Sequence, residues 1–173
     1  MGVTVRQMRP SEWLQYRRAI TQILRTSEPH EVGHLPIEKW KPRTWKKRAA
    51  RRASAPNVFF VAVSNSARLG PESKWVGTFG VHVRKGTKAE GRRSVGEIVE
   101  VWVDPEHRGR QPKDGQLTDC GQPIVDRFMD MAAAWARYNS GVHSLVVKTD
   151  TRNKRAQAAY ARNEFEAVQR HPR

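Results

Sequence analysis

Residues 97–110 read Glu-Ile-Val-Glu-Val-Trp-Val-Asp-Pro-Glu-His-Arg-Gly-Arg, an apolar segment that runs into a basic loop. Residues Glu97 to Val103 have the β-branched and aromatic composition of a buried strand. The strand ends at Asp104-Pro105, because proline cannot donate a hydrogen bond to a central ladder. A loop rich in glycine, proline and charge follows over Glu106 to Gly121. A strand that runs through such a loop into a helix offers backbone N–H groups to a phosphate, although a solvated basic turn is the plainer alternative.

The sequence after this loop alternates between helix and strand. Pro123 suits the first turn of a helix whose apolar face runs down to Asn139. We expect a strand over Ser144 to Lys148, a helix over Asn153 to Asn163, and a last short strand over Phe165 to Val168. Strands separated by helices predict parallel pairing with right-handed crossovers.

The first half of the chain adds three strands and two helices. The expected strands cover Val3 to Met8, Val58 to Val63 and Trp75 to Val83, and the expected helices cover about Ser11 to Leu24 and the segment from Pro42 onward. In the second helix Trp45, Ala49 and Ala53 recur at helical spacing on one face. With 173 residues, of which 38% are hydrophobic, the chain fits a single α/β domain over residues 1–173.

Charge is the unusual feature of the composition. The chain has 32 Lys and Arg against 17 Asp and Glu, which gives a net charge of +15. Thirteen of the basic residues, but only four of the acidic ones, lie within residues 1–56. The densest part of this surplus comprises Lys39, Lys41, Arg43, Lys46, Lys47, Arg48, Arg51 and Arg52. A polyanion, an anionic cofactor or an acidic surface is therefore the expected class of partner.

The composition argues against several functional classes. The single cysteine, Cys120, excludes an internal disulfide framework and a cysteine-rich zinc site, and it fits a reducing, cytoplasmic setting. The histidines have no metal-ligand spacing, so no metal is expected. The longest apolar runs, residues 58–63 and 131–136, are far shorter than the roughly 18 residues of a membrane-spanning helix. Met1 to Arg6 also lacks the apolar stretch of a signal peptide, so we expect a soluble protein with no membrane partner.

Two signatures, in this order, resemble the GNAT superfamily of acetyl-CoA-dependent N-acyltransferases. The first is Val101-Trp102-Val103-Asp104-Pro105-Glu106-His107-Arg108-Gly109-Arg110, followed by the helix from Gly121 to Ala136. The second is Asn153-Lys154-Arg155-Ala156-Gln157-Ala158-Ala159-Tyr160-Ala161-Arg162-Asn163-Glu164-Phe165. The resemblance covers Val3 to Val168 and implies a mixed, centrally parallel, twisted sheet flanked by about four helices. Residues 1–56 would form a basic acceptor side, and residues 95–165 an acetyl-CoA-binding core.

The resemblance also implies where acetyl-CoA, the co-substrate of the family, would bind. In GNAT proteins a splayed, bulged strand binds the pantetheine arm through its backbone, and the loop after it wraps the pyrophosphate. The residues that match the cofactor-binding positions are Val101, Trp102 and Val103 on the strand, Arg108, Gly109, Arg110 and Gly121 on the loop, and Asn153 before the last helix.

The family reaction is direct attack of an amine on the thioester, through an oxyanion that a strand N–H stabilises. The amine must be neutral to attack, so a carboxylate serves as the base, either directly or through water. Glu97 matches the position of that base, and Glu100 is the substitute candidate. Tyr160 matches the tyrosine that protonates the departing thiolate. Two simpler interpretations stay open, in which Glu97 only faces solvent and Tyr160 only packs with Phe165.

The sequence departs from the family pattern at three places. Residues 111–120 separate Arg110 from Gly121, so the loop is long, and Gly115 is the alternative residue to close it. The family glycine before the final Phe is Glu164. The chain ends at Arg173, so we expect the last strand to be short or missing. These departures leave open weakened acetyl-CoA binding, a swapped or homodimer-completed sheet, and loss of activity.

The basic surplus on the acceptor side disfavours a cationic acceptor such as an aminoglycoside. An aminoacyl-tRNA, a ribosomal or acidic protein, or an anionic small molecule fits better. We therefore expect an N-acetyltransferase that acts on a primary amine of an anionic or RNA-associated acceptor. The alternative is a nucleic-acid or acidic-protein binding module on a degenerate acetyltransferase scaffold. The arginines could also serve only ion pairing, solubility or CoA attraction.

Overall fold

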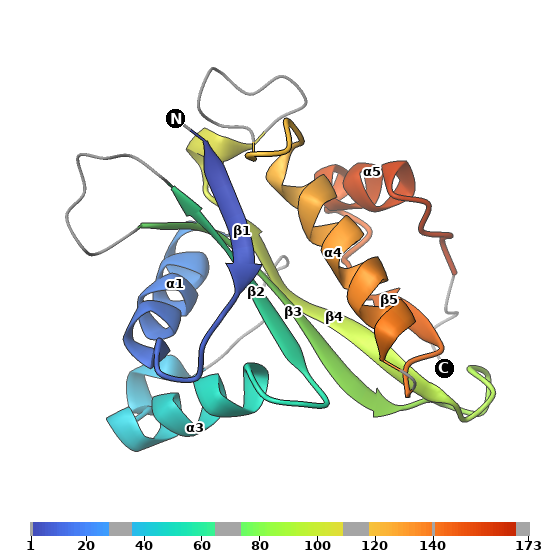
Figure 1. Ribbon diagram of the computed structural model, residues 1–173, viewed down its shortest axis with the longest axis horizontal. Coiled ribbons are helices and arrows are strands. Elements are labelled where there is room, and N and C mark those ends of the chain that lie inside the picture. The colour runs from blue at the N-terminus through green and yellow to red at the C-terminus, as the bar shows by residue number, and fades with distance from the viewer. Residues whose placement is uncertain (1, 28–35, 65–73, 109–117, 140, 169–173) are drawn as a thin grey trace.

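The computed structural model describes residues 2–27, 36–64, 74–108, 118–139 and 141–168. Its elements follow one another as β1 (Val3–Gln7), α1 (Trp13–Thr26), η1 (Ile37–Lys39), α3 (Pro42–Arg52), β2 (Val58–Ser64), β3 (Trp75–Lys85), β4 (Ser94–Val103), η2 (Pro105–His107), α4 (Ile124–Tyr138), β5 (Ser144–Val147) and α5 (Lys154–Arg162) (Figure 1). The expected strands and helices up to Asn163 are present, with ends that differ by up to three residues. Pro42 begins α3 as expected, whereas Pro123 is the residue before α4 rather than part of its first turn.

The five strands form one sheet in chain order, β1-β2-β3-β4-β5. The pairs β1–β2, β2–β3 and β3–β4 are antiparallel, and β4–β5 is parallel. The prediction of a mixed sheet is confirmed, but the prediction of a parallel centre is correct only for β4 and β5. A parallel pair needs a long crossover, and both α1 and α3 precede β2, so none of the described helices connects β2, β3 and β4.

Helices cover both faces of the sheet, as Figure 1 shows. On one face α4 packs on the sheet, and the ring of Phe128 stacks on Phe79 with centroids 5.5 Å apart. On the other face α1 and α3 bury Tyr16 and Trp45, and Tyr16 meets Phe59 of β2 edge to face at 5.3 Å. Each face buries alternate residues of β2, because successive side chains of a strand point to opposite sides.

A bulge interrupts β4 where it runs beside β3. The register between the two strands shifts between Thr78 and Gly80, which lie opposite Trp102 and Val99. Glu100, within the bulge, has a left-handed φ of 55°. The hydroxyl of Thr78 donates a hydrogen bond of 2.8 Å to the carbonyl oxygen of Glu100 and holds the bulge in place. The family resemblance implied a bulged strand at this position.

The strand expected over residues 165–168 is not formed, and that prediction is wrong. The chain instead folds back to cap α5. The N–H groups of Phe165 and Glu164 donate to the carbonyl oxygens of Tyr160 and Ala161, at 3.1 Å each, and the Phe165 ring lies 6.0 Å from the Tyr160 ring. This is a Schellman motif. Glu164, with φ 64°, stands at its left-handed position, where the family pattern has glycine.

Candidate functional site

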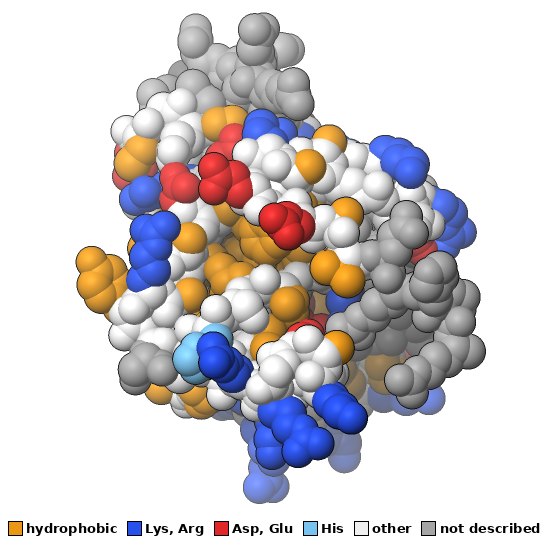
Figure 2. Space-filling view, turned by 90° about the vertical axis from the view of Figure 1, so that its right-hand side faces the viewer, with side chains coloured by type: hydrophobic (Ala, Val, Ile, Leu, Met, Phe, Trp, Pro, Cys, Tyr) orange, Lys and Arg blue, Asp and Glu red, His pale blue; other side chains and the backbone are white. Residues whose placement is uncertain are grey.

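A cavity of about 590 Å³ lies beside the bulged part of β4. The parallel ladder joins β4 to β5 from Val95↔Ser144 to Ile98↔Val147 and then ends. Beyond Ile98, the edge of β4 that faces β5 has no strand partner among the described residues, and this edge lines the cavity. The other walls come from the start of α4, from residues 147–149, from α5 and from the side chains of α3. Figure 2 looks onto the side that carries α5 and shows hydrophobic side chains gathered in the middle of that face.

Val101, Trp102 and Val103, which the sequence assigned to the pantetheine arm, all line the cavity. Their side chains are also committed to the core. Val101 and Val103 pack on the α4 side, whereas Trp102 is 3% exposed and packs on the α1 and α3 side. The buried indole N–H of Trp102 has no acceptor in the described part of the chain. Whether the backbone of these residues binds a ligand stays a prediction.

Two helix N-termini meet the cavity. Residues at or beside the first turns of α4 and α5 line it, and the first N–H groups of a helix lack intrahelical partners and attract anions. Asn153, a predicted cofactor residue, also lines the cavity. Its side-chain oxygen accepts a hydrogen bond of 3.0 Å from the Ala156 N–H, so Asn153 is the N-cap of α5.

The predicted pyrophosphate loop is only partly described. Arg108 lines the cavity, and its Nε donates a hydrogen bond of 2.5 Å to the carbonyl oxygen of Val103. Gly109 and Arg110 lie outside the described residues. Gly121 adopts a left-handed φ of 72° two residues before Pro123, but it does not line the cavity. The structure thus brings Arg108 to the site and places Gly121 apart from it.

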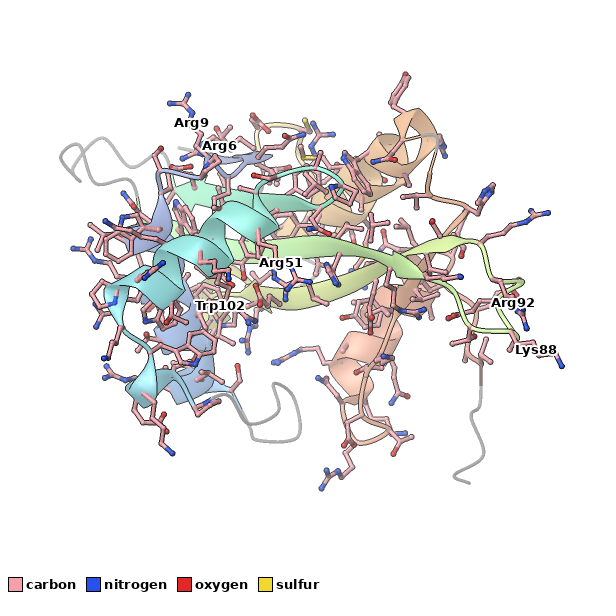
Figure 3. All side chains as sticks on the ribbon, turned by 90° about the horizontal axis from the view of Figure 1, so that it is seen from below. Arg6, Arg9, Arg51, Lys88, Arg92 and Trp102 are labelled. Carbon is pink, nitrogen blue, oxygen red and sulfur yellow. The ribbon has the colours of Figure 1, made fainter. Side chains whose placement is uncertain are left out.

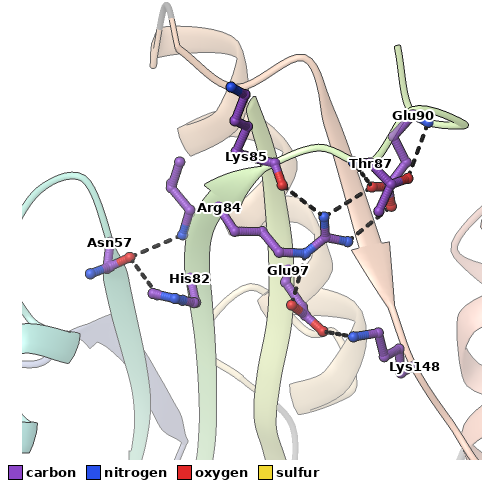
Figure 4. Close-up of polar contacts among 9 residues, drawn as sticks. Asn57, His82, Arg84, Lys85, Thr87, Glu90, Glu97 and Lys148 are labelled. Atoms are coloured by element: carbon purple, nitrogen blue, oxygen red, sulfur yellow. Dashed lines mark hydrogen bonds and ion pairs between the residues drawn. The ribbon is translucent and has the colours of Figure 1, made fainter. Parts of the chain in front are cut away.

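Glu97, the predicted base, lines the cavity within a network of ion pairs (Figure 4). Its carboxylate contacts Arg84 Nε at 2.9 Å and Lys148 Nζ at 2.6 Å. Burial raises the pKa of Glu97, but hydrogen bonds and charge from Lys148 and Arg84 outweigh this, so the pKa lies below its ordinary value. The carboxylate is therefore ionised at neutral pH and is a weaker base than an ordinary glutamate.

His82 lies directly opposite Glu97 in the β3–β4 ladder. Its Nδ1 is 2.9 Å from Asn57 Oδ1, which also accepts the N–H of Val83. Because Asn57 Oδ1 is an acceptor, Nδ1 carries the proton and Nε2 the lone pair. Burial and the nearby charges of Arg52 and Arg51 lower the pKa of His82 and favour the neutral ring. The spacing of the histidines in the sequence does not indicate this network.

Glu100, the substitute candidate, is held by three side chains from α1 and α3. Its carboxylate accepts hydrogen bonds from Tyr16 Oη at 2.9 Å, Arg48 Nη2 at 2.5 Å and Arg52 Nη2 at 3.1 Å. Arg48 and Arg52 line the cavity with Glu100. Sequence reasoning noted the basic helix but missed this convergence, which depends on the bulge and on how α1 and α3 pack.

Tyr160, the predicted proton donor, comes from α5 and lines the cavity. It is 9% exposed, and burial raises the pKa of its phenol to about 12. The hydroxyl is therefore protonated at neutral pH, and it can donate a hydrogen bond or a proton to a group bound in the cavity.

The cavity is positively charged. Its lining includes six Lys or Arg side chains and two carboxylates, Glu97 and Glu100. The six basic residues are Arg48, Arg52, Arg108, Lys148, Arg155 and Arg162. An excess of positive charge in a cavity raises the local concentration of anionic ligands.

In the described part of the chain, no group of three or more His, Cys, Asp and Glu side chains is arranged to hold a metal ion. No helix within the same residues has the length and apolar character needed to cross a membrane. Cys120 is exposed in the segment before α4.

At the sequence level, no protein-family model and no curated protein matches the chain. Solved structures do match along nearly its full length. AAC(6')-Iy in complex with a CoA bisubstrate analogue has a TM-score of 0.69 at 14% identity, with 99% of this chain and 96% of that chain covered. Glucosamine-6-phosphate N-acetyltransferase from Arabidopsis thaliana has a TM-score of 0.62 at 15% identity, with 100% and 99% covered.

A GNAT-family acetyltransferase from Streptococcus pneumoniae has a TM-score of 0.65 at 13% identity, and the match covers 92% of this chain and 82% of that chain. These three likenesses each cover 92% or more of this chain. The chain therefore has the fold of the GNAT acetyltransferases.

Proposed function

We propose that this chain is a GNAT N-acetyltransferase that moves an acetyl group from acetyl-CoA to a primary amine. The observation that carries the proposal is the bulge at Glu100, where β4 leaves β5 beside a positively charged cavity. The structure of AAC(6')-Iy with a CoA bisubstrate analogue supports it, because that protein has the same fold.

The residues present suit acetyl-CoA. Its phosphates are anionic, and the first turns of α4 and α5, together with Arg108, offer N–H donors and positive charge at the cavity wall. The unpaired edge of β4 beyond Ile98 offers backbone groups to the amides of the pantetheine arm. Acetyl-CoA would supply the activated acyl group, and the protein would align it with the amine.

The chemical step needs two proton transfers. The amine nitrogen forms a bond to the thioester carbonyl carbon, and the carbon–sulfur bond breaks. The proton lost by nitrogen passes to Glu97, directly or through water, and the phenol of Tyr160 gives its proton to the sulfur. A carboxylate with a lowered pKa removes a proton from the acidic ammonium formed on attack, and does not deprotonate the free ammonium. The amine must therefore arrive neutral.

The fold leaves the acceptor undecided. Proteins with this fold include aminoglycoside and glucosamine-6-phosphate acetyltransferases, whose acceptors differ in charge. In this chain, α1 and α3 together carry nine Lys or Arg and no Asp or Glu. This charge supports an anionic or RNA-associated acceptor, because a polycation would be repelled.

The same helices support the second candidate function, a nucleic-acid binding module on this scaffold. Figure 3 looks from below onto α3 and its basic side chains, Arg51 among them. Such a module would bind RNA or DNA with an affinity that falls steeply with added salt, through counterion release. It would not release CoA from acetyl-CoA.

Calorimetric titration of CoA and a thiol-release assay with a panel of amines test the proposal together. We expect CoA to bind and at least one amine to stimulate thiol release. Tyr160→Phe should bind CoA normally and turn over more slowly, whereas Tyr138→Phe, at a tyrosine that is 91% exposed, should behave as the wild type. Absence of both CoA binding and thiol release, with salt-sensitive RNA binding, would favour the second candidate.

A further inference from the structure

Two arginines on successive turns of α3 reach the cavity from the acceptor side. Arg48 and Arg52 stand four residues apart, so their side chains lie on the same face of the helix. Both guanidinium groups bind the same oxygen of Glu100, Oε1, at 2.5 Å and 3.1 Å. Both side chains are largely buried but line the cavity, with 27% and 15% of their surface exposed.

The donors of these two groups exceed the acceptors around them. A guanidinium has five N–H donors. Arg48 uses Nε for the Tyr16 hydroxyl and Nη2 for Glu100, and Arg52 uses Nη2 for Glu100. Within residues 2–27, 36–64, 74–108, 118–139 and 141–168, these three are the side-chain hydrogen bonds that the two guanidinium groups make. Donors left over at a cavity wall are available to a ligand.

The local charge is also unbalanced. Two guanidinium groups face the single carboxylate of Glu100. The other carboxylate of the cavity, Glu97, is already paired with Arg84 and Lys148. This wall therefore carries a net positive charge that an anionic ligand group would neutralise.

The guanidinium of Arg48 is held in a fixed orientation. The hydroxyl of Tyr16, which is fully buried, accepts its Nε–H at 2.9 Å, and the ring of Trp40 lies 5.0 Å from its central carbon. A guanidinium group that is already oriented loses less conformational entropy when it binds a carboxylate or phosphate.

We propose that Arg48 and Arg52 form a subsite for an oxyanion of the acceptor, a carboxylate or a phosphate monoester on the molecule that carries the amine. The inference rests on the proposed function, because it assigns the acceptor end of the same cavity. Glu100 is the internal partner that orients the two arginines, and the acceptor oxyanion takes the remaining donors. The amine then lies toward Glu97, three residues earlier on β4.

Matched acceptors test this subsite. Each pair should differ only in the oxyanion: β-alanine against its primary amide, and glucosamine 6-phosphate against glucosamine. We expect the wild type to have the higher kcat/KM for the anionic member of at least one pair. A preference in the β-alanine pair indicates carboxylate recognition, and a preference in the glucosamine pair indicates phosphate recognition. For that acceptor, Arg52→Gln should raise KM about tenfold or more with a smaller change in kcat, and leave KM for acetyl-CoA unchanged.

The controls separate this site from general charge. Arg137→Gln removes an exposed charge from the last turn of α4 and should change no kinetic constant. Arg52→Lys keeps the charge but loses the fork, and should restore only part of the affinity. An equal loss for the neutral and anionic members of a pair would overturn the subsite. So would an Arg51→Gln variant that loses as much as Arg52→Gln, because that result indicates a diffuse polyanion surface.

A binding measurement keeps the test independent of turnover. Succinate and inorganic phosphate can be titrated into the protein saturated with CoA, with thermal unfolding of each variant as the check on folding. We expect at least one anion to bind the wild type, and Arg52→Gln to bind it at least about tenfold more weakly. Equal binding by both proteins, or none by the wild type, would overturn the subsite. If CoA binds but no amine of any charge stimulates thiol release, the proposed function fails instead.

Discussion

The phenol of Tyr16 on α1 donates a hydrogen bond of 2.9 Å to the carboxylate of Glu100 on β4, across 84 residues of sequence. Burial raises the pKa of Tyr16 above its ordinary value, so the hydroxyl stays a neutral donor. Through this bond and those of Arg48 and Arg52, α1 and α3 hold the bulge of β4 beside the cavity. The basic helices and the bulged strand are therefore one structural unit.

Tyr16→Phe should test this coupling, because it removes the hydroxyl that donates to the Glu100 carboxylate and accepts a hydrogen bond from Arg48 Nε. We expect the free energy of unfolding to fall by about 1.5 to 3 kcal/mol in urea titrations, the usual range for a hydrogen bond to a charged group. Tyr138→Phe is the matched control and should leave the unfolding curve unchanged. A loss below about 0.5 kcal/mol, the range of neutral surface changes, would mean that these bonds do not stabilise the fold.

Tyr160→Phe should slow the chemical step and leave CoA binding intact, because the variant keeps the ring that packs near Phe165 and loses only the hydroxyl. General acid catalysis contributes about 10²- to 10⁴-fold, so we expect kcat to fall by about 10²-fold or more. Steady-state kinetics, with calorimetry for CoA, measure both quantities. An unchanged kcat would leave Tyr160 with a packing role alone.

Glu97→Gln should lower kcat/KM at every pH without moving its acidic limb. The wild-type pKa of Glu97 lies below its ordinary value, so the carboxylate is ionised throughout the working range, and the limb reports the pKa of the acceptor amine instead. A pH profile of both proteins over about pH 6 to 9 checks this. If the acidic limb of the kcat/KM profile disappears in the variant, that limb reports the titration of Glu97 itself, and the pKa of Glu97 is not depressed.

The same residue gives a prediction for stability against pH. A carboxylate whose folded pKa is depressed stabilises the protein above its unfolded pKa and loses that contribution as pH falls through the folded value. The difference in unfolding free energy between wild type and Glu97→Gln should be complete at neutral pH. It should shrink below about pH 4.5, the ordinary value for this side chain. Urea titrations at several pH values measure it, and a difference that grows on acidification would contradict the ion-pair account.

Glu164→Gly should stabilise the protein. Glu164 is an exposed residue held at φ 64° in the Schellman motif after α5, and this left-handed conformation costs most residues about 1 to 2 kcal/mol relative to glycine. We expect a gain of about 1 kcal/mol in the free energy of unfolding. Glu166→Gly, at an exposed position without a left-handed φ, is the control and should give no gain.

Periodicity and turn residues were enough to predict most elements, because strongly patterned segments such as α3 and β2 bury the faces that their sequences indicate. The prediction of a strand over residues 165–168 was wrong because a strand also needs a partner, and here the backbone groups of Glu164 and Phe165 instead cap α5. The prediction of a parallel centre was wrong because the direction of pairing depends on the connections between strands.

In the candidate site, only the residues that belong to sequence motifs could be predicted. Glu97, Tyr160 and Arg108 do line one cavity, as the family pattern implied. The partners of Glu97 and Glu100 come from distant elements, so no local spacing could indicate them. Arg84 and Lys148 reach Glu97 from β3 and from the segment after β5, and the partners of Glu100 depend on a bulge that changes which way its side chain points.

The central claim is acetyl transfer in this cavity to an amine that carries an oxyanion. Its most direct test is mass spectrometry of the products formed when the wild-type protein is incubated with acetyl-CoA and a mixed library of neutral and anionic primary amines. We expect free CoA to accumulate together with an N-acetylated product from the anionic group. No acetylated amine at all, or acetylation confined to the neutral or cationic amines, would contradict the account.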